Sequence, residues 1–193
     1  MQKDRDMELT QLSIEGAWLA TSPVWADERG SFREWFKAED IEAATGIRFG
    51  VAQANLSESK RGVVRGIHYS LAVDGQAKWV TCVIGAIKDV VVDIRPNSPT
   101  FGKHVVIDLI AGSGQAVLIS AGLGHGFVSL AEGSTVAYLV SSPFSPTEEF
   151  EINPLDPAIG IEWGLPLVEL LLSPKDSRAP DLHERNAQGK LPK

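Results

Sequence analysis

The fold of this chain is decided by residues 78–140, which read KWVTCVIGAIKDVVVDIRPNSPTFGKHVVIDLIAGSGQAVLISAGLGHGFVSLAEGSTVAYLV. Short segments rich in β-branched residues recur there, spanning residues 78–87, 89–95, 104–110, 116–119, 125–130 and 135–140. Turn residues separate the segments, and no helix of about ten residues fits between them, which disfavours a parallel α/β sheet. The pattern predicts an all-β fold, a jelly roll or a related β-barrel.

The segments on either side of this core predict small additions to it. Residues 38–44 read AEDIEAA, with acidic residues in the first turn and Gly46 as a stop, and they predict a short helix that covers the barrel. Residues 181–188 predict a second short helix near the end of the chain. The 193 residues contain no internal repeat or interdomain linker. We therefore expect one domain over residues 1–193, with short N-terminal and C-terminal extensions.

Composition excludes several classes of protein. With 44% hydrophobic and 22% charged residues, the chain lies near the average for globular proteins and is not disordered throughout. Its formal charge of −7 disfavours a basic face for nucleic acid or for an anionic membrane. The single cysteine, Cys82, lies in an apolar run, so we expect a buried thiol and a cytoplasmic location. The charged N-terminus and the lack of a long apolar run predict neither a signal peptide nor a membrane span.

Two of the four histidines have surroundings that fit an active site. His68 lies in the strand-like run RGIHY, where a bulge at the glycine would turn Arg65 and His68 to the same face. His125 lies between glycines in GLGHGF, where the backbone can approach another group closely. Taken alone, each is more simply a half-buried, hydrogen-bonded histidine. His104 and His183 are expected at the surface.

The sequence favours acid–base chemistry over other mechanisms. A metal site is disfavoured because no His-x-His pair occurs. No Gly-x-Ser-x-Gly elbow is present, and no Gly-x-Gly-x-x-Gly loop stands between a strand and a helix. What remains is proton transfer by carboxylates and by His68, Lys78 and Tyr138, with Arg29 and Arg65 to hold an anion. Read singly, the same residues fit a surface lysine, a core tyrosine and solvated arginines.

A set of motifs follows one another along most of the chain. They are DERG (27–30), QANLS (53–57), GVVRGIHY (62–69), DVVVDIR (89–95), SPTFG (98–102), GHGF (124–127), DPAIGI (156–161) and LSPKD (172–176). In this order they closely resemble the dTDP-4-dehydrorhamnose 3,5-epimerase family, and the resemblance covers about residues 12 to 180. No single short motif could produce such an ordered match by chance.

The resemblance implies a cupin-like jelly-roll homodimer that acts on dTDP-4-keto-6-deoxyglucose without a metal or another cofactor. An enzyme of this family would invert carbons next to the C4 ketone by removing and returning a proton through an enolate. Carried over motif by motif, the catalytic residues would be the base His68, its orienting carboxylate Asp176, the cation Lys78 facing the C4 oxygen, and the acid Tyr138 on the opposite face.

The resemblance also implies a set of substrate-binding residues: Arg29, Phe32, Glu34, Gln53, Asn55, Arg65, His125 and Phe144. Arg65 and Arg29 would clamp the diphosphate, and the segment around Arg29 would reach the neighbouring subunit's site. Phe144 replaces a paired tyrosine of the family and keeps one ring for stacking on the base. The run around Lys78 is similar to an actinobacterial branch that makes rhamnose or unusual natural-product sugars, and whose members invert C3, C5 or both.

Two alternatives use the same scaffold. A 3,4-ketoisomerase would also need a histidine base but no acid on the opposite face, so Tyr138 favours epimerisation. A catalytically silent sugar-nucleotide-binding protein would keep the arginines and lose the acid–base residues. The joint presence of His68, Lys78, Tyr138 and Asp176 favours an enzyme.

Overall fold

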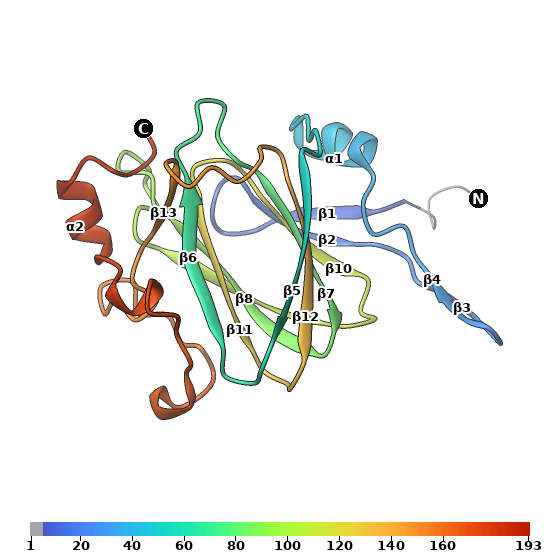
Figure 1. The fold of residues 1–193 in the computed structure, drawn as a ribbon. Helices are drawn as coiled ribbons and strands as arrows, with labels where there is room; N and C mark the ends of the chain where they lie inside the picture. Colours follow the sequence, from blue (N-terminus) through green and yellow to red (C-terminus); the bar gives the residue numbers. More distant parts are fainter. Residues whose placement is uncertain (1–5) are drawn as a thin grey trace.

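The computed structural model describes residues 6–193, in which two antiparallel sheets face each other (Figure 1). The six-stranded sheet has the order β1 (Glu8–Gln11), β2 (Ala17–Thr21), β10 (Gln115–Ile119), β7 (Lys78–Ile84), β12 (Ser134–Val140) and β5 (Gln53–Ser59). The five-stranded sheet has the order β13 (Glu149–Glu151), β6 (Val64–Ser70), β11 (Leu123–Ser129), β8 (Ala86–Asp93) and β9 (His104–Ile110). The predicted all-β, jelly-roll class is confirmed.

Helices are short and peripheral, as predicted. Helix α1 (Ala38–Thr45) ends at Gly46, whose left-handed backbone lets its N–H donate to the carbonyl of Glu42. Helix α2 (Leu182–Ala187) begins with a reciprocal capping box between Asp181 and Glu184. Two 3₁₀ turns, Leu167–Glu169 and Asp176–Arg178, lie in the C-terminal segment. None of the helices in residues 6–193 has the length and apolar character needed to cross a membrane.

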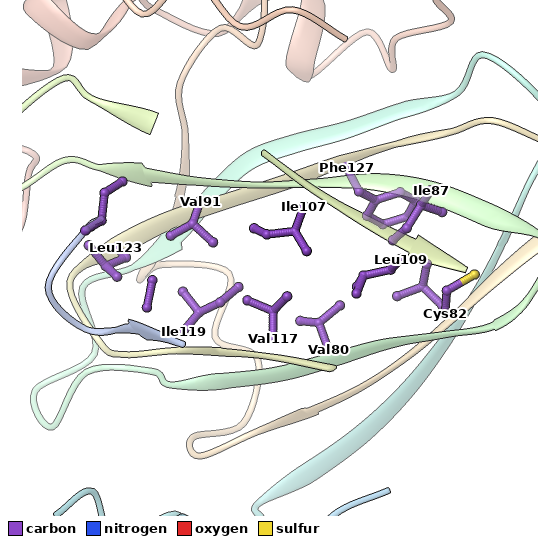
Figure 2. Close-up of a cluster of buried hydrophobic side chains, with 13 residues drawn as sticks. Val80, Cys82, Ile87, Val91, Ile107, Leu109, Val117, Ile119, Leu123 and Phe127 are labelled. Atoms are coloured by element: carbon purple, nitrogen blue, oxygen red, sulfur yellow. The ribbon is translucent and has the colours of Figure 1, made fainter. Parts of the chain in front are cut away.

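The apolar core lies between the sheets. Its side chains alternate along the strands and include Val80, Cys82, Ile87, Val91, Ile107, Leu109, Val117, Ile119, Leu123 and Phe127 (Figure 2). Cys82 is buried, as expected. On the outer face of the five-stranded sheet, the C-terminal segment buries a second apolar cluster. A third apolar cluster lies on the outer face of the six-stranded sheet, where helix α1 and neighbouring residues cover it. The covering position of this helix is as predicted.

Two expectations about the strands need correction. The predicted segment 78–87 is two strands, because Gly85 adopts a positive φ of 75° and turns the chain between β7 and β8. The edge strands β1, β5 and β13 and the inner strand β2 lie outside the predicted segments. Every second residue of β5 faces inward, and these are polar: Gln53, Asn55, Ser57 and Ser59. An inward polar face lacks the apolar alternation by which a half-buried strand is predicted.

A small hairpin projects from the sandwich near the N-terminus (Figure 1). It consists of β3 (Trp25–Asp27) and β4 (Gly30–Phe32), and all six strand residues are exposed. The rings of Trp25 and Phe32 stack at 5.9 Å between centroids. The hairpin therefore presents aromatic surface outside the body of its own chain.

Candidate active site

A cavity of about 680 Å³ lies at the end of the sandwich where β6 and β13 face β5, β7 and β12. All four predicted catalytic residues line it: His68, Lys78, Tyr138 and Asp176. His68 comes from the five-stranded sheet, whereas Lys78 and Tyr138 come from the six-stranded sheet. The cavity therefore has acid–base groups on two facing walls.

His68 and Asp176 form a hydrogen-bonded pair. His68 Nε2 lies 2.7 Å from Asp176 Oδ1, and the exposed fractions of the two side chains are 38% and 5%. A carboxylate can only accept, so Nε2 carries the hydrogen and Nδ1 keeps a lone pair for a proton. Burial would raise the pKa of the Asp176 carboxyl, but the hydrogen bonds of His68 and Ser173 and the positive charge of Lys175 help to outweigh it, and the pKa lies below its usual value.

A bulge in β6 turns Arg65 and His68 to the same cavity, which is the arrangement that the sequence allowed only with a bulge at Gly66. Gly66 has a φ of 122°, and the pairing register with β11 shifts between the partners of His68 and Arg65. A Cβ on Gly66 would lie 2.5 Å from the Cα of Gly126, so these two strands can approach only with glycine there. Both residues line the cavity.

Lys78 is a buried lysine in the cavity wall. The residue is 7% exposed, and its Nζ donates to the carbonyl of His68 at 3.4 Å. Burial lowers the pKa of the Lys78 ammonium, and the negative charges of Glu149 and Asp89 oppose that shift. When protonated, a desolvated ammonium stabilises negative charge on a nearby oxygen more strongly than one in water.

Tyr138 is half-buried in β12, directly opposite Asn55 of β5 and Val80 of β7. Burial raises the pKa of its phenol, and the positive charge of Arg65 opposes the shift. The phenol therefore keeps its proton at neutral pH, as a proton donor must.

Four of the predicted binding residues line the same cavity: Gln53, Asn55, Arg65 and Phe144. Gln53 Nε2 donates to Asn55 Oδ1 at 2.7 Å, and the Phe144 N–H donates to Gln53 Oε1 at 3.1 Å. Arg65 Nε donates to Ser59 Oγ at 3.1 Å. Hydrogen bonds thus hold this wall in one arrangement.

His125 lies deeper than the main cavity. Its Nε2 is 2.7 Å from Asp89 Oδ2, and both residues are buried. It lines a smaller chamber of about 160 Å³ that shares Arg65, His68, Lys78 and Tyr138 with the main cavity. A ligand group would have to enter that chamber to reach it.

Three predicted binding residues do not reach the cavity of their own chain. Arg29 and Phe32 lie on the projecting hairpin, where Arg29 pairs with Asp27. Glu34 follows the hairpin and is exposed. None of the three lines the cavity of its own chain.

The structure adds cavity residues that sequence analysis missed. Gln76, Glu149, Phe150 and Lys175 line the cavity. Lys175 Nζ also pairs with Glu151 at 2.8 Å. Lys175 lies within the LSPKD motif next to Asp176, and Gln76 lies two residues before Lys78, so closeness in sequence to predicted catalytic residues was an available signal. Glu149 and Phe150 had none, because β13 carried no strand pattern.

Metal-ligating side chains are scattered in the described part of the chain. Within residues 6–193, no three His, Cys, Asp or Glu residues are grouped closely enough to hold a metal ion.

A jelly roll that places a histidine–aspartate pair, a buried lysine and a protonated tyrosine around one cavity defines an acid–base enzyme with a cupin-like fold. The family model described as dTDP-4-dehydrorhamnose 3,5-epimerase matches residues 11–184. The chain belongs to this family, whose members are isomerases.

Relatives cover nearly the whole chain. It is 46% identical over 186 residues to a dTDP-4-dehydrorhamnose 3,5-epimerase of Mycolicibacterium smegmatis, covering 96% of this chain and 91% of the relative. A crystal structure of a 4-keto-6-deoxy sugar epimerase from the novobiocin gene cluster of Streptomyces spheroides superposes with a TM-score of 0.92 at 46% identity, covering 96% and 92% of the two chains. The structure of a 3′-monoepimerase of Streptomyces bikiniensis, solved in complex with dTDP-quinovose, superposes with a TM-score of 0.89 at 46% identity. The match covers 94% of this chain and 91% of that chain.

Proposed function

We propose that this protein inverts carbons next to the C4 ketone of dTDP-4-keto-6-deoxyglucose. The observation that supports this best is the placement of His68 and Tyr138 on facing sheets of one cavity. A sugar ring held between the sheets would lose a proton to one wall and regain it from the other. That exchange of faces is what epimerisation requires.

The proposed reaction has three steps. His68 removes the proton next to the ketone through Nδ1, while Asp176 holds the imidazole by Nε2. Negative charge moves to the C4 oxygen, where the Lys78 ammonium stabilises the enolate. Tyr138 then donates its phenolic proton to the same carbon from the opposite face. The electron pair of the broken C–H bond ends in the new one, and no cofactor is needed.

The remaining cavity residues would bind the nucleotide. Arg65 suits the diphosphate, because a guanidinium can give two parallel hydrogen bonds to phosphate oxygens. Phe144, 61% exposed at the rim, offers a ring for stacking on the base. Arg29 of a partner subunit would complete the diphosphate site in a homodimer. The single buried thiol and the nucleotide-sugar substrate fit a cytoplasmic protein.

The proposal is tested by incubating the protein with dTDP-4-keto-6-deoxyglucose in deuterated water and following the sugar by NMR. The wild type should place deuterium on C3, C5 or both and invert each carbon that exchanges. His68→Ala should abolish exchange and keep affinity for dTDP. His183→Ala, a change of an exposed histidine outside the cavity, is the matched control and should exchange normally. Full exchange by His68→Ala would remove His68 from the mechanism.

A further inference from the structure

Gln76 occupies an enclosed position at the wall of the cavity, two residues before Lys78. It is 8% exposed. Its Nε2 donates to Glu149 Oε1 at 3.0 Å and to the carbonyl of Ser142 at 3.2 Å. Both partners can only accept hydrogen bonds, so the NH₂ group of the amide must face them, and both of its hydrogens are used.

The backbone beside Gln76 is held firmly. The Ala77 N–H donates to Ser141 Oγ at 2.8 Å, and the Ser141 N–H donates to the carbonyl of Ala77 at 3.0 Å. The connection between β12 and β13 and the start of β7 therefore form one unit. The amide of Gln76 is a fixed anchor for whatever it binds on the cavity side.

The group that it binds is the carboxylate of Glu149, which lines the cavity together with Lys78. Several titratable groups surround Lys78: Glu149 from β13, Asp89 from β8, His68 from β6, His125 from β11 and Tyr138 from β12. Of the two carboxylates, Asp89 already binds His125. Glu149 is the carboxylate that lines the cavity with Lys78, and its negative charge favours the protonated form of the lysine.

A free glutamate side chain has three rotatable bonds and would turn toward solvent at an open cavity. If the Glu149 carboxylate moved away, the buried Lys78 would lose a nearby negative charge that favours its protonated form. The hydrogen bond from Gln76 instead holds the Glu149 carboxylate at the cavity wall.

We propose that Gln76 is a positioning residue: its amide fixes the Glu149 carboxylate in the wall that Lys78 faces, so that the lysine stays charged where the enolate forms. The inference rests on the proposed function for the role of Lys78. The contact itself is independent of the reaction, and so is the measurement that tests it.

The measurement is the pKa of Lys78, followed by NMR in protein labelled with ¹³C at the lysine ε-carbon. The resonance is assigned by its loss in Lys78→Arg. Gln76→Met keeps the length of the side chain and removes both donors. It should lower the pKa of Lys78 by about 0.5 unit and reduce kcat by up to about threefold, which is the largest change in protonated fraction that such a shift allows, with the alkaline limb of the rate profile moving to lower pH. Gln115→Met, outside the cavity on β10, is the matched control and should change neither.

A double-mutant cycle then separates positioning from a general structural effect. Glu149→Gln should lower the pKa of Lys78 by about one unit, and adding Gln76→Met should lower it no further, because Gln76 acts through Glu149. An equal shift from Gln76→Met in both backgrounds, or no shift in either, would overturn the inference. If Gln76→Met does not fold, Gln76→His supplies the test: it keeps one N–H donor and should hold the pKa of Lys78 above its value in Glu149→Gln. A pKa equal to that in Glu149→Gln would contradict the proposal.

Failure of the proposed function looks different. In that case the wild type itself would not exchange deuterium into the sugar, whereas the lysine titration would still report on Gln76.

Discussion

At the scale of single residues, the site depends on which nitrogen of His68 is free. Asp176 reaches Nε2 from a segment 108 residues further along the chain and leaves Nδ1 toward the cavity. We expect Asp176→Asn to keep affinity for dTDP but to slow deuterium exchange by about 10²–10⁴-fold, because an amide can hold the wrong tautomer of the imidazole. Exchange rates from NMR and dTDP titrations measure the two effects. Exchange at the wild-type rate would contradict an orienting role.

Tyr138 separates proton removal from inversion. In Tyr138→Phe, His68 can still remove a proton and return it to the same face, so we expect deuterium incorporation with little epimer. The loss of an acid should reduce inversion by about 10²–10⁴-fold relative to exchange. The ratio of epimer to deuterated substrate in one NMR time course measures this directly. Inversion at the wild-type rate would make Tyr138 a packing residue.

At the scale of elements, the turn after β8 is held by one buried carboxylate. Asp93 is fully buried and accepts hydrogen bonds from Arg95, Ser98 and Thr100. Burial alone would raise the pKa of Asp93, but these hydrogen bonds outweigh it and hold the pKa at about 2. The turn brings Gly102 and Lys103 back to pair with Asp93 at the start of β9.

This carboxylate makes stability depend on pH. Its folded pKa of about 2 lies below the unfolded value of 3.8, so its contribution is complete above about pH 4 and is lost as pH falls toward 2. We expect Asp93→Asn to reduce the free energy of unfolding by about 2 kcal/mol at pH 7. Urea unfolding at pH 7 and at pH 3 checks this, and the difference between the two proteins should shrink at the lower pH. A constant difference would place the effect in packing.

At the scale of the whole molecule, the β3–β4 hairpin lies outside the sandwich with Arg29 and Phe32 exposed (Figure 1). We expect Arg29 to serve a partner's cavity in a homodimer. Arg29→Ala and His68→Ala would then each be defective, but a mixed dimer would contain one intact site. Random mixing of equal amounts should restore about a quarter of wild-type activity, since half of the dimers are mixed and each has one of two sites intact. Activity of the mixture no greater than the average of the two variants would place Arg29 in the site of its own chain. A monomer in analytical ultracentrifugation would exclude a contribution of Arg29 to a partner's site.

Much of the molecule could be predicted from the sequence by itself. Segments such as 104–110 and 135–140, the helix ending at Gly46 and the buried Cys82 follow from local periodicity and turn chemistry. The glycine before Ile67 and His68 marked a place where a bulge was possible, and the structure has one there. Such features depend on neighbouring residues, so a linear pattern contains them.

Only the tertiary structure decided which residues from distant segments of the chain come together. Strand β5 turns polar residues inward because it borders a cavity, and a polar inward face looks like a loop in the sequence. Glu149 meets Gln76 across 73 residues, and Arg29 lies on a hairpin outside the cavity of its own chain. The physical reason is that a strand's pairing partners and the direction of its buried face are set by packing against other strands, which no local pattern specifies.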